Sequence, residues 1–242
     1  MITAAITERL RAAVGRYGAV GAVVRAARLA AWAAGRALYL RERHVWYRLD
    51  LGSPRPRFDL RPGLELMRAG AADLPLLEQL ETVGRAEAQR RLAGGADLWM
   101  VRNGNDALFA CWIFRGRMPV LAAPGGWLAL PARTVGMEDS IANPRYRGTG
   151  VAPAAWSTLA DHLARAGVAA IVTKVEEQNT PCRRSIEKAG FRIVAGMYLR
   201  RICMRPRVQM TAHDTPPSCA FLLESLGPEM TRRRVRRSWA SR

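Results

Sequence analysis

Apolar residues in the first part of the chain recur at the spacing of an amphipathic helix. Between residues 4 and 48, apolar positions such as Val23 and Ala27 fall on one side and Arg25 and Arg28 on the other. Arginines interrupt every apolar stretch well short of the ~20 residues that a transmembrane helix needs. We expect a basic helical extension that either docks on protein or lies on an anionic membrane surface.

A short proline-rich segment separates this extension from the rest of the chain. Pro54 and Pro56 oppose both a helix and a central strand, so the segment around them is predicted to be a linker. The pattern that follows predicts strands, helices and a hairpin around Asn103–Asp106. These elements are a strand at 64–68, helices within 71–92, strands at 98–102 and 107–115, and further strands at 127–130 and 134–142.

The second half has clearer helix signals. Pro153 suits the first turn of a helix that stops at Gly167, and Thr180 caps a second helix that ends at Gly190. An apolar strand at 168–175 separates them, and strands at 191–194 and 197–204 are predicted to form a closing hairpin. Together these elements predict an α/β fold in which helices flank a central mixed sheet. From residue 209 onward, prolines and clustered arginines predict a disordered tail.

Three regions follow from this pattern. They are a basic amphipathic helical extension and linker at 1–57, a main domain at 64–207, and a flexible basic tail at 208–242. The net charge of +18 reflects 38 basic and 20 acidic residues. Such a charge favours an anionic partner, such as nucleic acid, an acidic membrane or a phosphorylated cofactor, or reflects an arginine-rich composition. The four cysteines show neither metal-ligand spacing nor a disulfide framework, so we expect no metal and a cytoplasmic location.

The stretch Arg145-Tyr-Arg-Gly-Thr-Gly-Val-Ala152 carries the strongest chemical signal. It follows an apolar strand and opens a helix. Gly148 and Gly150 let the main chain approach a ligand closely, and the first turn of a helix presents unpaired N–H groups at a positive dipole end. A pyrophosphate fits such a site.

The order "PRYRGTGVA", helix, strand, "EEQNTPCRRSIEKAGF" resembles the GNAT acyltransferase superfamily over residues 64–207. The resemblance implies a GNAT-like sheet, an acyl-CoA donor, usually acetyl-CoA, and transfer to an amine. It also implies a set of cofactor-binding residues. Main-chain amides from Arg147, Gly148, Thr149, Gly150, Val151 and Ala152 would hold the pyrophosphate, Ile141 and Ala142 would flank the pantetheine where two strands splay, and Asn179 would contact the cofactor.

The reaction that this resemblance implies needs a base for the amine and a donor for the oxyanion. Glu138 and Asp139 are the candidate bases, just upstream of the loop. Strand alternation predicts that only one of them points into the cleft, and we favour Asp139. The alternative for either residue is a surface carboxylate that pairs with an arginine. A backbone N–H of Ile141 or Ala142 is the candidate oxyanion donor.

One position departs from the family pattern. Many members carry a tyrosine seven residues after the asparagine, as the acid for the leaving thiolate, and this chain has Ile186 there. Water, Tyr146 or Tyr198 would then supply the proton, or the site binds CoA without efficient turnover.

The sequence therefore leaves three functions to compare. The first is a cytoplasmic N-acetyltransferase, held at the inner membrane face if residues 4–48 bind anionic lipid, that acts on a small-molecule, glycan or peptide amine. The second is an acyl-CoA-binding module with little turnover. The third is a nucleic-acid-associated protein. The scarcity of aromatic residues among the basic ones outside the N-terminal helix argues against it. The oligomeric state is left open.

Overall fold

The computed structural model describes residue 24 and residues 39–80, 82–202 and 205–227. The chain divides into two compact units, 1–42 with 199–207, and 43–198 with 208–242. The described part of the first unit is chiefly the ends of three strands. The expected helix between residues 4 and 38 lies outside the described residues apart from position 24, as does the expected tail beyond 227.

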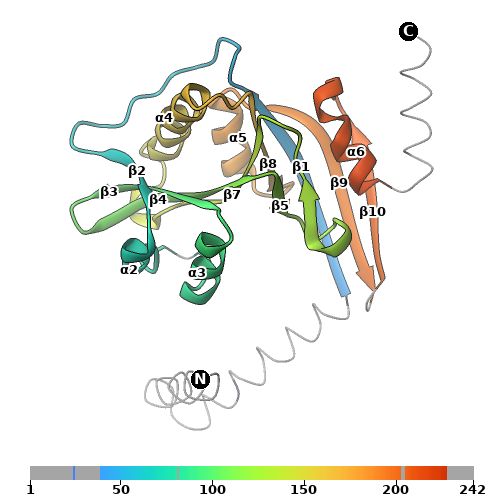
Figure 1. The fold of residues 1–242 in the computed structure, drawn as a ribbon, viewed down its shortest axis with the longest axis horizontal. Helices are drawn as coiled ribbons and strands as arrows, with labels where there is room; N and C mark the ends of the chain where they lie inside the picture. Colours follow the sequence, from blue (N-terminus) through green and yellow to red (C-terminus); the bar gives the residue numbers. More distant parts are fainter. Residues whose placement is uncertain (1–23, 25–38, 81, 203–204, 228–242) are drawn as a thin grey trace. The chain divides into compact units, whose positions relative to one another are not determined.

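The second unit is built on a mixed sheet with the strand order β10-β9-β1-β8-β7-β4-β3-β2 (Figure 1). The strands are β1 (Tyr39–Asp50), β2 (Glu65–Ala69), β3 (Asp97–Asn103), β4 (Asp106–Arg115), β7 (Thr134–Ala142), β8 (Ala170–Glu176), β9 (Arg192–Ile202) and β10 (Arg205–Ala212). A separate pair joins β5 (Arg117–Pro119) to β6 (Trp127–Ala129). Strands β7 and β8 run parallel, whereas β1 pairs antiparallel with β8 and β4 with β7. The predicted α/β fold with a mixed sheet is confirmed.

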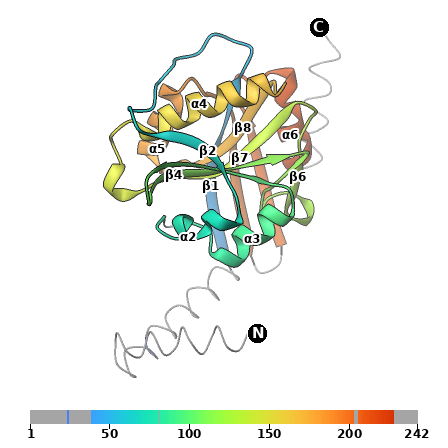
Figure 2. The same ribbon diagram turned by 60° about the vertical axis from the view of Figure 1, so that its left-hand side comes forward.

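Helices cover both faces of this sheet (Figure 2). The helices are α2 (Leu74–Leu77), α3 (Arg85–Ala93), α4 (Val151–Arg165), α5 (Thr180–Lys188) and α6 (Ala220–Leu226), with short 3-10 turns η1 (Ala71–Asp73), η2 (Pro124–Gly126), η3 (Pro144–Tyr146) and η4 (Pro217–Cys219). One apolar cluster joins α4 and α5 to the sheet through residues such as Trp156 and Ile186. A second cluster joins α2, α3 and α6 to the opposite face around Trp112.

The expected helix is wrong over residues 39–48, because these residues belong to β1. Residues 45–49 are buried without a break, since β1 lies in the middle of the sheet between β8 and β9. A strand with both faces covered lacks the alternation that identifies strands in a sequence. Arg48 is buried there and bonded to Asp50, so its charge misled the helical interpretation.

The end of the chain also differs from the prediction. Residues 205–212 form β10 and residues 220–226 form α6, so the expected disorder is wrong for these segments. Leu222 and Leu223 of α6 are buried in the same cluster as Trp112, which offsets the entropy of ordering the chain. Two of the prolines that suggested disorder, Pro216 and Pro217, lie in the connection between the two elements. The predicted closing hairpin is instead one continuous strand, β9, paired with β10.

Among the described residues, no helix is both long and apolar enough to cross a membrane.

Candidate functional site

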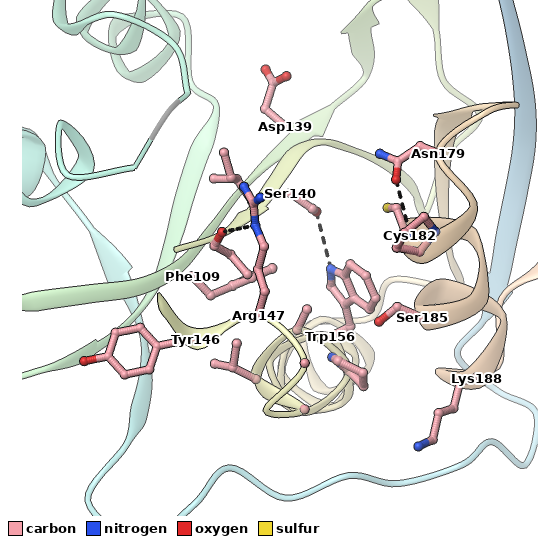
Figure 3. A pocket seen from close by; sticks show the side chains of 18 of the residues that line it. Phe109, Asp139, Ser140, Tyr146, Arg147, Trp156, Asn179, Cys182, Ser185 and Lys188 are labelled. Carbon is pink, nitrogen blue, oxygen red and sulfur yellow. Dashed lines mark hydrogen bonds between the residues drawn. The ribbon is translucent and has the colours of Figure 1, made fainter. Parts of the chain in front are cut away.

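Strands β7 and β8 separate shortly after they begin to pair. Their parallel register covers only Thr134–Gly136 against Ala170–Val172, although β7 continues to Ala142. A cavity of about 940 Å³ lies where the strands diverge (Figure 3). Its lining comes from the end of β7, the following loop, the start of α4 and one side of α5. The lining includes Asp139, Ser140, Ile141, Ala142, Tyr146, Arg147, Gly148, Gly150, Val151, Ala152, Trp156, Asn179, Cys182, Ser185 and Lys188.

The loop before α4 presents bare main-chain donors to this cavity. Gly148 and Gly150 have φ angles of 76° and 84°, a left-handed conformation that side chains other than glycine rarely adopt. A Cβ atom added at either glycine meets no protein atom within 4 Å, so it would project into open space. Within the described chain, the N–H groups of Gly148, Gly150, Val151 and Ala152 have no hydrogen-bond acceptor.

Side chains fix the shape of this loop from outside. The amide of Asn143 accepts a hydrogen bond from the N–H of Arg145 and donates one to the carbonyl of Ala107. The hydroxyl of Thr149 donates to the carbonyl of Tyr146 at 2.7 Å, and Thr149 does not line the cavity. Every other residue predicted to bind the cofactor does line it. These contacts fix the conformation of the loop and leave the N–H groups of Gly148, Gly150, Val151 and Ala152 available to a ligand.

Asn179 sits at the opposite wall, as the N-cap of α5. Its Oδ1 accepts the N–H of Cys182 at 3.3 Å, which leaves the Nδ2 donor for the cavity (Figure 3). The side of α5 that faces the cavity carries Cys182, Ser185 and Lys188. Burial raises the pKa of the Cys182 thiol, so it stays protonated at neutral pH. Ile186 points the other way and is buried in the core beneath α4.

A β-bulge interrupts β7 at the candidate bases. Ala110 pairs with Ile141 and Trp112 with Glu138, so Asp139 and Ser140 together oppose one residue of β4. Asp139 adopts a φ of 49° at the bulge.

The regular alternation of side chains along β7 is interrupted at this bulge. Glu138 and Asp139 both lie on the α3 side, because Glu138 is opposite Trp112 and Asp139 binds Arg91 of α3. Only Asp139 lines the cavity.

Residues 67–191 match the model of the Acetyltransferase (GNAT) family. The chain belongs to this family. GNAT proteins transfer an acyl group from acyl-CoA, so the cavity at the end of β7 lies in a domain of the family that the sequence resembles.

Solved structures with this fold are distant in sequence. A GNAT-family acetyltransferase from Colwellia psychrerythraea is 14% identical, with a TM-score of 0.49 over 72% of this chain and 57% of that one. A Drosophila protein is 11% identical, with a TM-score of 0.50 over 74% of this chain and 58% of that one. A putative GNAT acetyltransferase from Novosphingobium aromaticivorans is 17% identical, with a TM-score of 0.47, over 72% of this chain and 66% of that one. This GNAT chain thus spans about three fifths of the length of these proteins. No curated protein matches the sequence.

Both candidate bases form ion pairs on the α3 side of the GNAT sheet. Lys174 of β8 binds both carboxylate oxygens of Glu138, at 2.7 and 2.5 Å. Arg91 donates to Oδ2 of Asp139 at 2.6 Å and lies 5.3 Å from the centre of the Trp112 ring. Burial raises the pKa of Glu138, and the ammonium of Lys174 opposes that shift. The partners are far apart in sequence, so local patterns carry no signal of these contacts.

Three further aromatic side chains bear on the site: Trp156, Tyr146 and Tyr198. The indole N–H of Trp156 donates to the hydroxyl of Ser140 at 3.3 Å, which ties α4 to the bulge. The ring of Tyr146 lines the cavity, but its hydroxyl points away from Asn179 and Ser185 (Figure 3). Tyr198 is not part of the lining; the guanidinium of Arg43 lies 5.6 Å from its ring centre.

Proposed function

We propose that this chain transfers the acyl group of an acyl-CoA, with acetyl-CoA as the expected donor, to a primary amine by direct attack on the thioester. The observation that carries the proposal is the set of four N–H groups, at Gly148, Gly150, Val151 and Ala152, that have no acceptor among the residues the structure describes. They lie at the start of a fifteen-residue helix, α4, where the helix dipole also favours an anion. A diphosphate supplies the acceptors that these groups lack.

The backbone of β7 then guides the pantetheine toward the bulge. The N–H of Asn143 bonds to Leu108 of β4, so alternation turns the N–H and carbonyl of Ala142 toward the gap left by β8. The contact between Arg147 Nε and the carbonyl of Ala142, at 3.3 Å, agrees with this direction. Of the two candidate oxyanion donors, Ile141 and Ala142, this pairing favours Ala142.

Asp139 is the base in this proposal. Its Oδ2 is held by Arg91, and its Oδ1 has no hydrogen-bond partner among the described residues. Oδ1 is thus available to take a proton from an incoming ammonium group, after which the amine nitrogen attacks the thioester carbonyl. Glu138 stays bound to Lys174 outside the cavity lining, which makes it the weaker of the two candidates.

The leaving thiolate must be protonated without a tyrosine at position 186. Ile186 is 1% exposed and belongs to the core, so a proton comes from water or from the Ser185 hydroxyl, which lines the cavity one residue earlier. This same observation favours a second candidate function, an acyl-CoA-binding module with little turnover. Release of free CoA in the presence of a panel of amines separates the two.

Calorimetric titration with CoA tests the proposed donor site. Gly150→Val puts a branched side chain at a cavity-lining position whose φ of 84° disfavours side chains. It should lower the affinity for CoA by about 100-fold or more, the loss expected for two charge-assisted hydrogen bonds. Gly167→Val is the matched control, since Gly167 has a φ of 80° at the other end of α4, with no atom within 4 Å of an added Cβ. Unchanged affinity in Gly150→Val, or equal loss in both variants, contradicts the assignment.

A further inference from the structure

The ion pair between Lys174 and Glu138 bridges the two strands just where they separate. Gly136 and Val172 are the last residues in register, and Glu138 and Lys174 each stand two positions further along their strands. The ammonium contacts both carboxylate oxygens, at 2.7 and 2.5 Å. The ion pair therefore links β7 and β8 at a point where main-chain hydrogen bonds no longer join them.

Large aromatic side chains enclose this ion pair. Trp46 of β1 is the register partner of Lys174, and Trp112 of β4 is the register partner of Glu138. Both tryptophans are fully buried, and their Nε1 atoms have no hydrogen-bond partner in the described structure. The side chains of Lys174 and Glu138 are 14% and 12% exposed. The ion pair is thus largely removed from solvent, and the register partner of each member is a buried tryptophan.

The cavity begins one residue beyond this ion pair. Along β7 its lining runs backward from Ala142 to Asp139, and the next residue is Glu138. The unpaired amides that suit a diphosphate lie at the far end of that run, between Gly148 and Ala152. A donor anchored by its diphosphate therefore directs its acyl end toward the bulge and toward the ion pair.

We infer that the Lys174–Glu138 ion pair forms the inner limit of the donor site and restricts the transferred acyl group to a short chain. The inference rests on the proposed function, because it takes the cavity as the acyl-CoA site. A longer alkyl chain that continues along β7 would have to part the two charges or be buried against them. Separating a buried ion pair leaves uncompensated charge, which outweighs the gain from burying a few methylene groups.

A double variant, Lys174→Met with Glu138→Leu, tests this limit. It removes both charges and keeps similar volume, a change that folded proteins usually tolerate, whereas removal of one partner does not. Affinities for CoA, acetyl-CoA, butyryl-CoA and hexanoyl-CoA are measured by calorimetry on the full chain. The wild-type affinity should fall as the acyl group lengthens. In the double variant, the affinity should instead rise as the acyl group lengthens. The expected gain is up to about four-fold per added methylene, which is the fold-change for ~0.8 kcal/mol of burial.

The matched control is Arg43→Gln with Glu177→Gln, which removes an exposed ion pair of 3.4 Å between Arg43 of β1 and Glu177, the residue after β8. This control variant should bind CoA and the three acyl-CoA compounds in the same order of affinity as the wild type. A double variant that binds CoA but keeps the wild-type order overturns the inference, as does a wild type that binds all acyl lengths equally well. Absence of CoA binding to the wild type instead contradicts the proposed function, so the two failures are distinguishable.

Discussion

The two faces of β7 carry different chemistry near the cavity. On the side of α4 and α5, the site consists of main-chain N–H groups that glycines leave uncovered, and its polar atoms are available to a ligand. On the side of α3, the polar atoms belong to charged side chains that are already paired, Arg91 with Asp139 and Lys174 with Glu138. The first face suits binding of an anion, and the second suits positioning of a carboxylate.

This difference predicts how each face responds to substitution. The α4 face depends on backbone conformation, so side-chain charge changes there should matter little and changes at Gly148 or Gly150 should matter greatly. The α3 face depends on charge balance, so removal of a single charge should be costly there.

The largest expected effect concerns the α3 face and is a loss of catalysis without a loss of CoA binding. Asp139→Asn removes the proposed base and should lower kcat/KM by roughly 100- to 10,000-fold while the Kd for CoA is unchanged. Steady-state kinetics with an accepted amine, together with calorimetry, measure both quantities. Asp161→Asn is the control, because Asp161 is about equally exposed and also pairs with an arginine, Arg55, but lies on α4 away from the cavity lining. Full activity in Asp139→Asn would remove Asp139 as the base.

The next effect concerns stability rather than activity. Lys174→Met leaves the Glu138 carboxylate buried without its partner and should lower the free energy of unfolding by about 3–5 kcal/mol. The double variant Lys174→Met with Glu138→Leu should recover most of that loss. Urea denaturation of the wild type and both variants gives the three values. A single variant as stable as the wild type would show that the charges on this face are not coupled.

Tyr47 provides a comparable test on the α5 side. Its hydroxyl donates to Glu187 at 2.8 Å and accepts from Arg183 Nε at 3.0 Å, and burial is the main reason that its pKa is raised to about 12. Tyr47→Phe should lower the free energy of unfolding by about 1–2 kcal/mol.

The pH dependence gives a second readout for Tyr47. The unfolded chain releases the tyrosine proton near pH 10, about two pH units before the folded chain does, so this residue's contribution to stability falls as pH rises from 10 to 12. Chemical denaturation at pH 9 and pH 11 should show less loss in Tyr47→Phe than in the wild type. An equal loss in both proteins would contradict the raised pKa.

The smallest effect involves Glu87, which supports Arg91 from within α3. Hydrogen bonds from Arg90 and Arg91 lower the pKa of Glu87, so its contribution to stability is present above the unfolded pKa and is lost as pH falls through the folded pKa. Glu87 is 41% exposed, and solvent screening keeps the expected loss in Glu87→Gln below about 1 kcal/mol. The loss should shrink further in high salt. A salt-independent loss would indicate packing rather than charge.

Local signals explain why the α4 face was predictable from the sequence. Gly148, Gly150 and Pro153 fall within six residues, and each reports a backbone conformation that the structure contains: a left-handed turn, a left-handed N-cap and a helix start. Asn179 caps α5 through a contact three residues away. The fold class was predictable from the sequence for the same reason, because helix caps and apolar runs are short-range features.

The α3 face depends on contacts that sequence patterns do not encode. Lys174 lies 36 residues from Glu138, and Arg91 lies 48 residues from Asp139. The bulge that turns Asp139 to the side of Glu138 arises from register with β4, so an argument from regular alternation fails there. Strand β1 was missed because its pairing partners, β8 and β9, lie more than 100 residues later in the chain.

The most direct test of the account is an NMR titration of the full chain with CoA that follows its backbone amides. The account predicts that the signals of Gly148, Gly150, Val151 and Ala152 shift together, at low CoA concentration, and that pantetheine without the diphosphate leaves them in place. The amide signals of Gly167, at the other end of α4, should not move. Saturable CoA binding that leaves these four amides unchanged would contradict the diphosphate site and the donor orientation built on it.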